Sequence, residues 1–402
     1  MKSAFARILA TLALTPLVCS VAQAAAPTFA RYSTPAFASG LQESNLTAAS
    51  AKADFDGQGM TVDPTNGDIY LVDADGADMI LKITSAGVVS VFKTDAQLFA
   101  AIDAVNGTSN ATGFNPRQLA FSADGDLIVT GFPTTNTNQD ALLSITPAGV
   151  ITVVYTATDA NVGILDGSGA LAVVGNTAYI ATDRSNGSLA QVYSIDTNAA
   201  GPTATVTTLV SEAQMDAFYD VAEPGHTFTG VNFGVNSLAT DGVDLFATVS
   251  SLNGTNDVLK ITTAGVISRL YSDTQLVAGL DALTVAAGDV TVVSCGGIAV
   301  DQNGSLWLAN AFGTGTFDDT VFRITSAGIF EGIEEGNGTV AGTLSNMLGT
   351  TANSFSNDSL VAVRTGPLAG KVLFVENSES PAAGETIAIT DYNSSVSEWS
   401  MY

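Results

Sequence analysis

The sequence is poor in cysteine, histidine and basic residues. Its 402 residues include two cysteines, one histidine and 13 lysines and arginines, against 39 aspartates and glutamates. Cys19 lies in an N-terminal segment that we expect to be removed, so Cys295 has no partner for an internal disulfide. The same counts exclude a zinc site of the Cys/His type. A hydrophobic core must therefore hold the fold, and 46% hydrophobic residues can supply one.

The shortage of positive charge bears on possible partners. A formal net charge of −26 repels nucleic-acid phosphates and anionic lipid, so we expect neither nucleic acid nor a membrane surface as a partner. Beyond the N-terminal segment, no stretch reaches the ~18 uninterrupted apolar residues of a membrane-spanning helix, which argues against membrane insertion. The acidity suits either solubility in a salty medium or cation binding.

The N-terminal residues 1–24 have the pattern of a secretory signal peptide. Lys2 and Arg7 precede an apolar run, and the small residues Ala22 and Ala24 fit a cleavage site after Ala24. We therefore expect a bacterial protein that is secreted or periplasmic. We also expect it to be a monomer.

One hairpin sequence occurs four times: KITSAGVVSVF begins at residue 82, SITPAGVITVV at 144, KITTAGVISRL at 260 and RITSAGIFEGI at 323. A second element, typified by GMTVDPTNGDIYLVD at 59–73 and GIAVDQNGSLWLAN at 297–310, occurs six times. Its anchor residues recur at a mean interval of 60 residues: Met60, Leu119, Leu171, Leu238, Ile298 and Leu360. A period of this length indicates a repeat architecture.

These two elements together predict an all-β fold, a six-bladed β-propeller of four-stranded antiparallel blades over residues 56–402. One blade alone cannot bury both of its apolar faces, so the blades must stack around an axis. Capping-box patterns predict short helices between blades at 94–103, 211–220 and 272–281. The N-terminal segment 25–55 contains FARYSTPAF, which resembles an outer strand and could close the ring; residues 395–402 could do so instead.

The second loop of each blade and the crossovers between blades are longer than the other turns. Because binding residues concentrate in loops on a rigid scaffold, this long-loop face is the predicted functional face. The mouth of the central channel on this face is predicted to contain Asp56, Gln58, Asn115, Arg117, Asp166, Asn236 and Asp358. Carboxylate and amide oxygens of this kind suit calcium, although they could instead satisfy backbone groups where strands begin.

Two groups of acidic residues allow different interpretations. Asp73, Asp75 and Asp78 share the loop DADGAD, which could bind calcium or could be a solvated acidic turn. Acidic residues also recur before the third strand of five blades, at Asp78, Asp140, Asp257, Asp319 and Glu385. This recurrence favours a structural role as hydrogen-bond acceptors.

Candidates for nucleophilic catalysis are few. Cys295 enters an inner strand without a histidine nearby in sequence, so we expect a buried, unreactive thiol. A Ser-His-Asp triad would depend on the single histidine, His226, and no GxSxG motif is present.

The blade units, each with its IT.AG hairpin, resemble those of six-bladed NHL-repeat, gluconolactonase-type and streptogramin-lyase-type propellers. The gluconolactonase resemblance implies a divalent metal held by Glu, Asn and Asp at inner-strand starts. These positions correspond here to Gln58, Asn236 and Asp358, with Gln58 in place of the acidic ligand.

Two functions follow as hypotheses. The first is an exported binding protein that presents the long-loop face to a protein or glycan partner and carries calcium. The second is a metal-dependent hydrolase or lactonase with its site at the channel mouth.

Overall fold

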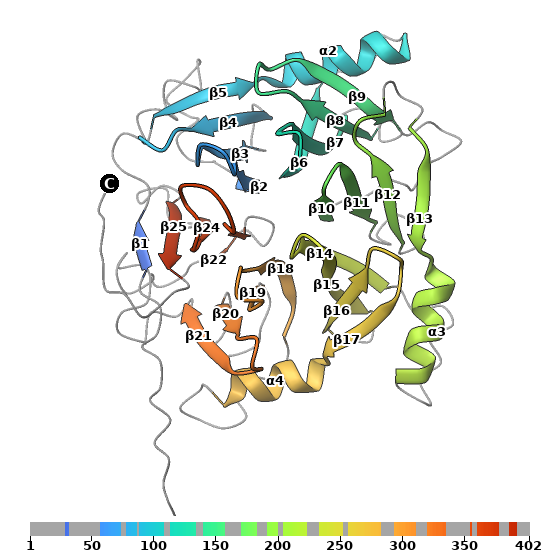
Figure 1. Ribbon diagram of the computed structural model, residues 1–402, viewed down its shortest axis with the longest axis vertical. Coiled ribbons are helices and arrows are strands. Elements are labelled where there is room, and N and C mark those ends of the chain that lie inside the picture. The colour runs from blue at the N-terminus through green and yellow to red at the C-terminus, as the bar shows by residue number, and fades with distance from the viewer. Residues whose placement is uncertain are drawn as a thin grey trace, which may run out of the picture.

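The computed structural model has the β-propeller architecture that the repeats predict (Figure 1). It describes residues 29–31, 57–73, 78–86, 88–107, 113–133, 140–156, 170–182, 191–199, 204–222, 233–251, 256–282, 293–310, 320–334, 354–355, 360–377 and 386–391. Among these residues, no helix is long and apolar enough to cross a membrane.

Five sheets are four-stranded antiparallel blades in which consecutive strands pair from the inside outward. Blade 1 contains β2 (Gly57–Val62), β3 (Ile69–Asp73), β4 (Met79–Ile83) and β5 (Val89–Lys93). Blade 2 contains β6 (Phe114–Phe121), β7 (Leu127–Pro133), β8 (Ala141–Ile145) and β9 (Ile151–Thr156). Blade 3 contains β10 (Ala170–Val174), β11 (Thr177–Ala181), β12 (Val192–Asp196) and β13 (Val206–Val210). Blade 4 contains β14 (Phe233–Thr240), β15 (Asp244–Ser251), β16 (Asn256–Thr262) and β17 (Ile267–Tyr271), and blade 5 contains β18 (Cys295–Val300), β19 (Leu306–Asn310), β20 (Thr320–Ile324) and β21 (Phe330–Glu334).

The prediction of six four-stranded blades was wrong, because the structure has five. The sixth repeat belongs to a five-stranded sheet, the closing sheet, which combines both ends of the chain. It contains β1 (Phe29–Arg31), β22 (Ser354–Phe355), β23 (Val361–Ala362), β24 (Lys371–Asn377) and β25 (Thr386–Asp391). Its inner edge is split between β22 and β23, which both pair with β24, while β1 pairs with the outer side of β25.

The closing sheet lies between blade 5 and blade 1. Val372 and Phe374 pack with Trp307 of blade 5, whereas Val363 and Leu373 pack with the core of blade 1. The arrangement in Figure 1 agrees, with β24 and β25 between the first and last blades. Both apolar faces of this sheet are thereby covered.

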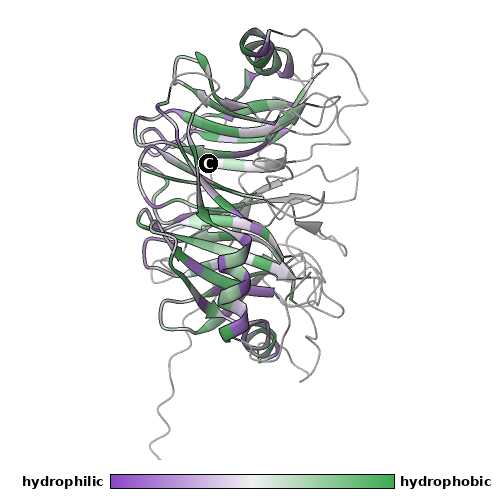
Figure 2. Cartoon of the chain, turned by 90° about the vertical axis from the view of Figure 1, so that its right-hand side faces the viewer, coloured by the Kyte–Doolittle hydropathy of each residue, from purple (hydrophilic) through white to green (hydrophobic). Residues whose placement is uncertain are grey.

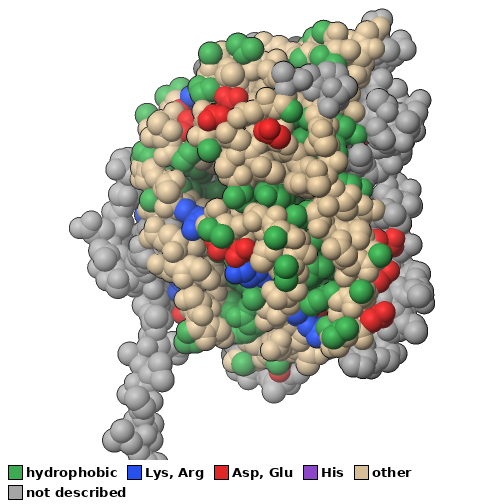
Figure 3. All heavy atoms as spheres, turned by 45° about the vertical axis from the view of Figure 1, so that its right-hand side comes forward, with side chains coloured by type: hydrophobic (Ala, Val, Ile, Leu, Met, Phe, Trp, Pro, Cys, Tyr) green, Lys and Arg blue, Asp and Glu red, His purple; other side chains and the backbone are tan. Residues whose placement is uncertain are grey.

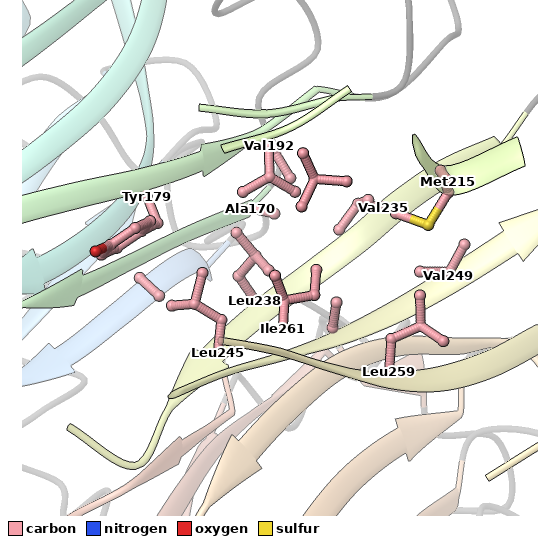
Figure 4. Packing of buried hydrophobic residues seen from close by; sticks show 14 of the residues in the cluster. Ala170, Tyr179, Val192, Met215, Val235, Leu238, Leu245, Val249, Leu259 and Ile261 are labelled. Atoms are coloured by element: carbon pink, nitrogen blue, oxygen red, sulfur yellow. The ribbon is translucent and has the colours of Figure 1, made fainter. Parts of the chain in front are cut away.

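The core consists of hydrophobic layers between neighbouring sheets. Figure 4 shows the layer between blades 3 and 4, where Val192 and Tyr179 face Leu238, Leu245 and Ile261. Along the strands hydrophobic residues predominate, and hydrophilic residues gather at the tight turns on one face (Figure 2). This face, where the first and third turns of the blades lie, is called the short-turn face below.

In the described part of the chain, three helices fill the outer rim at the junctions between blades. They are α2 (Asp95–Asn106), α3 (Glu212–Ala222) and α4 (Asp273–Asp281), so the helices predicted from the capping boxes are confirmed. Thr94 and Ser272 each form a complete capping box with a glutamine three residues later. Each helix buries a few apolar side chains against the blades, among them Leu98, Met215 and Leu276. The helices therefore extend the layers between blades outward.

The repeated IT.AG hairpin has two structural requirements. Its threonine hydroxyl accepts a hydrogen bond from the amide four residues later, at 3.1 Å in Thr84 and again in Thr262. Its glycine adopts a positive φ, which is 81° at Gly265. Gly265 also lies against the Leu209 carbonyl of the preceding blade, where an added Cβ would be only 2.5 Å from that oxygen. Glycine here meets both a local and an inter-blade constraint.

We predict that Gly265→Ala lowers the free energy of unfolding by about 2–4 kcal/mol, combining left-handed strain with an inter-blade clash. Gly175→Ala is the matched control, because Gly175 has a φ of 61° but no atom within 4 Å of an added Cβ. The control should cost only about 1–2 kcal/mol. Urea denaturation of both variants measures the difference, and equal losses would rule out the inter-blade contribution.

Asp95, the first residue of α2, connects this helix to the next blade. Its Oδ1 accepts a hydrogen bond from the backbone N–H of Phe114, where β6 begins. Burial raises the pKa of Asp95, and the hydrogen bond from Phe114 opposes this shift only in part. Folding therefore favours the protonated carboxyl, so the stability linked to this group is present at low pH and decreases as pH rises through the folded pKa.

We predict that Asp95→Asn, whose amide oxygen can still accept from Phe114, stabilises the protein at pH 7 relative to the unsubstituted chain. The gain should vanish below about pH 4, where the carboxyl is protonated in both the folded and unfolded states. Thermal melts from pH 3 to 8 measure this, with the exposed Asp220→Asn as control. If the melting temperatures of Asp95→Asn and the parent chain followed parallel pH curves, the interpretation would be wrong.

Candidate functional site

A recurrent β-bulge lies near the start of the inner strands. In blades 2, 4 and 5 the register skips one inner-strand residue, which is Arg117, Asn236 and Gly296 respectively. In blade 1 one extra residue falls between Gly57 and Met60, the interval that contains Gln58. Because a bulge re-aims the side chain at that point, these positions differ from the regular alternation of the rest of the strand. Three of the bulge positions, Gln58, Arg117 and Asn236, are residues that the sequence predicts at the channel mouth.

Arg117 lies on an aromatic platform in blade 2. Its guanidinium stands over the ring of Phe132, 4.7 Å from the centroid. Asn115 pairs directly with Phe132 across β6 and β7, so the three residues lie together at the start of β6. Oδ1 of Asn115 is buried and has no hydrogen-bond partner within the described part of the chain. This group combines a cation held on a ring with an unsatisfied acceptor.

Asn236 connects two blades. Its Nδ2 donates to the carbonyl oxygen of Cys295 at 3.3 Å, and its Oδ1 accepts from the Ser250 hydroxyl at 2.9 Å. The amide thus joins β14 to its neighbour in blade 4 and to the first residue of blade 5. These contacts agree with the alternative interpretation of the channel-mouth residues, that they satisfy groups where strands begin.

Cys295 is the unreactive thiol that the sequence predicts. Its side chain is buried, and burial, with a smaller contribution from the negative charge of Asp273, raises its pKa to about 12. The thiolate needed for nucleophilic attack is therefore scarce at neutral pH.

The acidic residues before third strands include one clear structural acceptor. Asp257 accepts from the backbone N–H of Asp273 at 2.9 Å and from Nη1 of Arg269 at 3.2 Å. It is buried, and it ties the start of β16 to α4 and β17. This agrees with the structural role predicted for the recurrent acidic residues.

The DADGAD loop is described only at its two ends. Asp73 ends β3 and is buried, whereas Asp78 is half-buried and has a φ of 41°. The following residues named in the sequence analysis lie outside the described residues: Asp56, Asp75, Asp166, His226, Asp319, Asp358 and Glu385; so does the Gln58 side chain. Within the described ranges, no three His, Cys, Asp or Glu side chains come together as a possible metal site. The described donors of these types therefore do not form a calcium ligand set.

Sequence reasoning placed Arg117 at the channel mouth but missed the aromatic ring beneath it. Phe132 follows Arg117 by 15 residues, and only the pairing of β6 with β7 brings them together. The bulge itself has no sequence signal that we could identify.

No family model and no curated protein sequence matches this chain. Among solved structures, a candidate gluconolactonase superposes with a TM-score of 0.50 at 10% identity, over 92% of this chain and 93% of that one. This similarity supports the β-propeller fold and, at such low identity, the fold alone.

Two further structures are similar over parts of the chain. A triple arginine-to-alanine mutant of AofleA from Arthrobotrys oligospora matches with a TM-score of 0.46 and 11% identity over 85% of each chain. Prolyl oligopeptidase B from Galerina marginata matches with a TM-score of 0.39 and 12% identity, over 70% of this chain and 34% of that one. This chain therefore matches about a third of the oligopeptidase.

Proposed function

We propose that this chain is an exported β-propeller binding protein that presents its long-loop face and channel mouth to a glycan or protein partner. The observation that carries the proposal is the group formed by Arg117, Phe132 and Asn115 at the start of β6. Arginine and aromatic side chains dominate binding energy at interfaces. Stacking on Phe132 also restricts the rotamers of Arg117, so less conformational entropy is lost when a ligand binds.

The unsatisfied Asn115 oxygen supports a hydroxyl-bearing ligand. A buried acceptor without a donor costs free energy, and a ligand hydroxyl that reaches it would recover that cost. The guanidinium supplies donors beside it. A few fixed polar groups next to an apolar ring are typical of ligand sites in rigid scaffolds. We therefore favour a glycan over a protein as the partner.

The alternative is a metal-dependent hydrolase or lactonase that uses Asn236 and Asp358. The position of Asn236 at a bulge of an inner strand favours it. Two observations weigh against it: both ends of the Asn236 amide already have intramolecular partners, and Arg117 brings a positive charge to an equivalent bulge. The binding function is therefore our first choice.

We predict that Arg117→Ala weakens glycan binding at least tenfold while leaving the melting temperature nearly unchanged. The measurement is a glycan array probed with the labelled protein, residues 25–402, followed by titration of the strongest ligand. Lys93→Ala is the control, because it removes the same charge from outer strand β5, where Lys93 lies over Phe92. Binding that Arg117→Ala leaves intact would contradict this site.

The same array distinguishes the two functions. If no glycan binds, hydrolysis of a lactone and ester panel with added divalent ions becomes the deciding measurement. Activity that Asn236→Ala abolishes would establish the hydrolase and overturn the proposal.

We further propose that the loop containing Asp73, Asp75 and Asp78 binds calcium in a structural role. Asp73 ends β3 and Asp78 immediately precedes β4, so the two flank one tight connection between paired strands. Three carboxylates so close in sequence supply the kind of oxygen ligands that calcium prefers.

We predict that calcium raises the melting temperature of the chelator-treated protein and that magnesium does so less. A ligand at a hundred times its dissociation constant adds about 2.7 kcal/mol, which a thermal melt resolves. Asp75→Ala should abolish the shift, whereas Asp358→Ala, at the channel mouth, should preserve it. A shift that Asp358→Ala abolishes and Asp75→Ala preserves would instead indicate an ion at the channel mouth. If calcium produced no specific shift at all, both proposed sites would be refuted.

A further inference from the structure

The opposite end of the central channel, on the short-turn face, contains a second arginine with unusual surroundings. Arg364 follows β23, the part of the inner edge of the closing sheet that contacts β2 and β18. The turn after it packs on blade 1, where Gly366 lies against the Pro64 carbonyl and Pro367 lies near Gly67. The turn is therefore held in place by its neighbour.

The side chain of Arg364 extends to a blade that is not adjacent. A Cβ added to Gly242, in the turn between β14 and β15, would lie 3.3 Å from Nη1 of Arg364. Blade 5 separates blade 4 from the closing sheet, so the guanidinium reaches past the end of β18. It thus connects the turn after β23 with the turn between β14 and β15.

Within the described residues, no hydrogen bond or ion pair joins the Arg364 guanidinium to another group, and its Nε is buried without a partner. The carboxylate of Asp241, next to Gly242, forms hydrogen bonds within its own turn: Oδ1 accepts from the backbone amides of Val243 and Asp244. A partly desolvated guanidinium without an acceptor is costly. In a chain where acidic residues outnumber basic ones 39 to 13, this is unexpected.

We propose that Arg364 anchors a second binding site that takes a short aliphatic carboxylate at the short-turn end of the channel. A guanidinium pairs with a carboxylate through two parallel hydrogen bonds, and here the two Nη groups would donate them, because the Nε–H is buried. A singly charged carboxylate is favoured over a phosphate dianion, because the net charge of −26 repels the dianion more strongly.

The surroundings favour an aliphatic tail. Val243 follows Gly242, the residue nearest to Nη1 of Arg364 in this turn, and its apolar side chain is 65% exposed. Figure 3 shows hydrophobic side chains interspersed with a few acidic and basic groups on the part of the surface that faces the viewer. The site lies at the other end of the inner strands from Arg117, so this proposal is independent of the glycan proposal.

The test is calorimetric titration of the protein, residues 25–402, with sodium butyrate at constant ionic strength, compared with acetate and inorganic phosphate. We expect saturable butyrate binding, weaker acetate binding and the weakest phosphate binding. Arg364→Gln should reduce butyrate affinity at least tenfold, and Arg364→Lys should reduce it severalfold, because lysine keeps the charge but loses the paired hydrogen bonds.

Lys93→Gln is the control, since it makes the same charge change on outer strand β5 and should leave butyrate affinity unchanged. Circular dichroism melts establish whether each variant is folded. If Arg364→Gln does not fold, the butyrate affinity of Arg364→Lys is the measurement that tests the proposal. Butyrate binding that is equal in the parent chain and the folded Arg364 variant would overturn the proposal. A parent chain that does not bind butyrate would also overturn it and would leave Arg364 with a purely structural role.

Discussion

Every sheet in this protein has two apolar faces, and each face must be covered by a neighbouring sheet. The buried strands show the constraint directly, since all residues of β3 and β8 are buried. An open row of such sheets would leave one apolar face exposed at each end, so the row must close into a ring. No disulfide strengthens the closure, because Cys295 is a free, buried thiol. Hydrophobic contact on both sides of the closing sheet therefore supports the whole fold.

This constraint explains why the closing sheet combines both ends of the chain. β24 and β25 form a regular antiparallel pair, but the inner edge is divided between β22 and β23, and β1 from the N-terminal segment adds the outermost strand. What the neighbours require is coverage of apolar area, and Val363, Val372, Leu373 and Phe374 provide it. An irregular sheet can satisfy that requirement as well as a regular blade, so the sixth repeat tolerates the most divergence.

The sequence revealed features that depend on local chemistry. The IT.AG hairpins need a threonine hydroxyl and a glycine at fixed offsets, and the helices need a hydroxyl with a glutamine three residues later, so each leaves a short pattern. The outer strand from the N-terminal segment was among the predicted ways to close the ring, and β1 does pair with β25. The missed feature of the sixth sheet is its inner edge, which is divided between the short strands β22 and β23. The contacts of Arg117 with Phe132 and of Arg364 with the Gly242 turn arise from sheet pairing and ring closure, which no local pattern records.

Several of the described basic side chains share one structural arrangement. Lys82 pairs with Asp68, Lys260 with Asp244 and Arg323 with Glu331, each between neighbouring strands or turns of one blade. Lys82, Lys260 and Arg323 also lie over the aromatic rings of Tyr70, Phe246 and Trp307, so the same arrangement recurs from blade to blade. Arg117 also lies over a ring of its own blade, that of Phe132, but it does so at a bulge of an inner strand, and Arg364 extends to a turn of a non-adjacent blade. If Arg117 and Arg364 serve the two proposed sites, their positive charge within a strongly negative molecule favours neutral or singly charged ligands over polyanions.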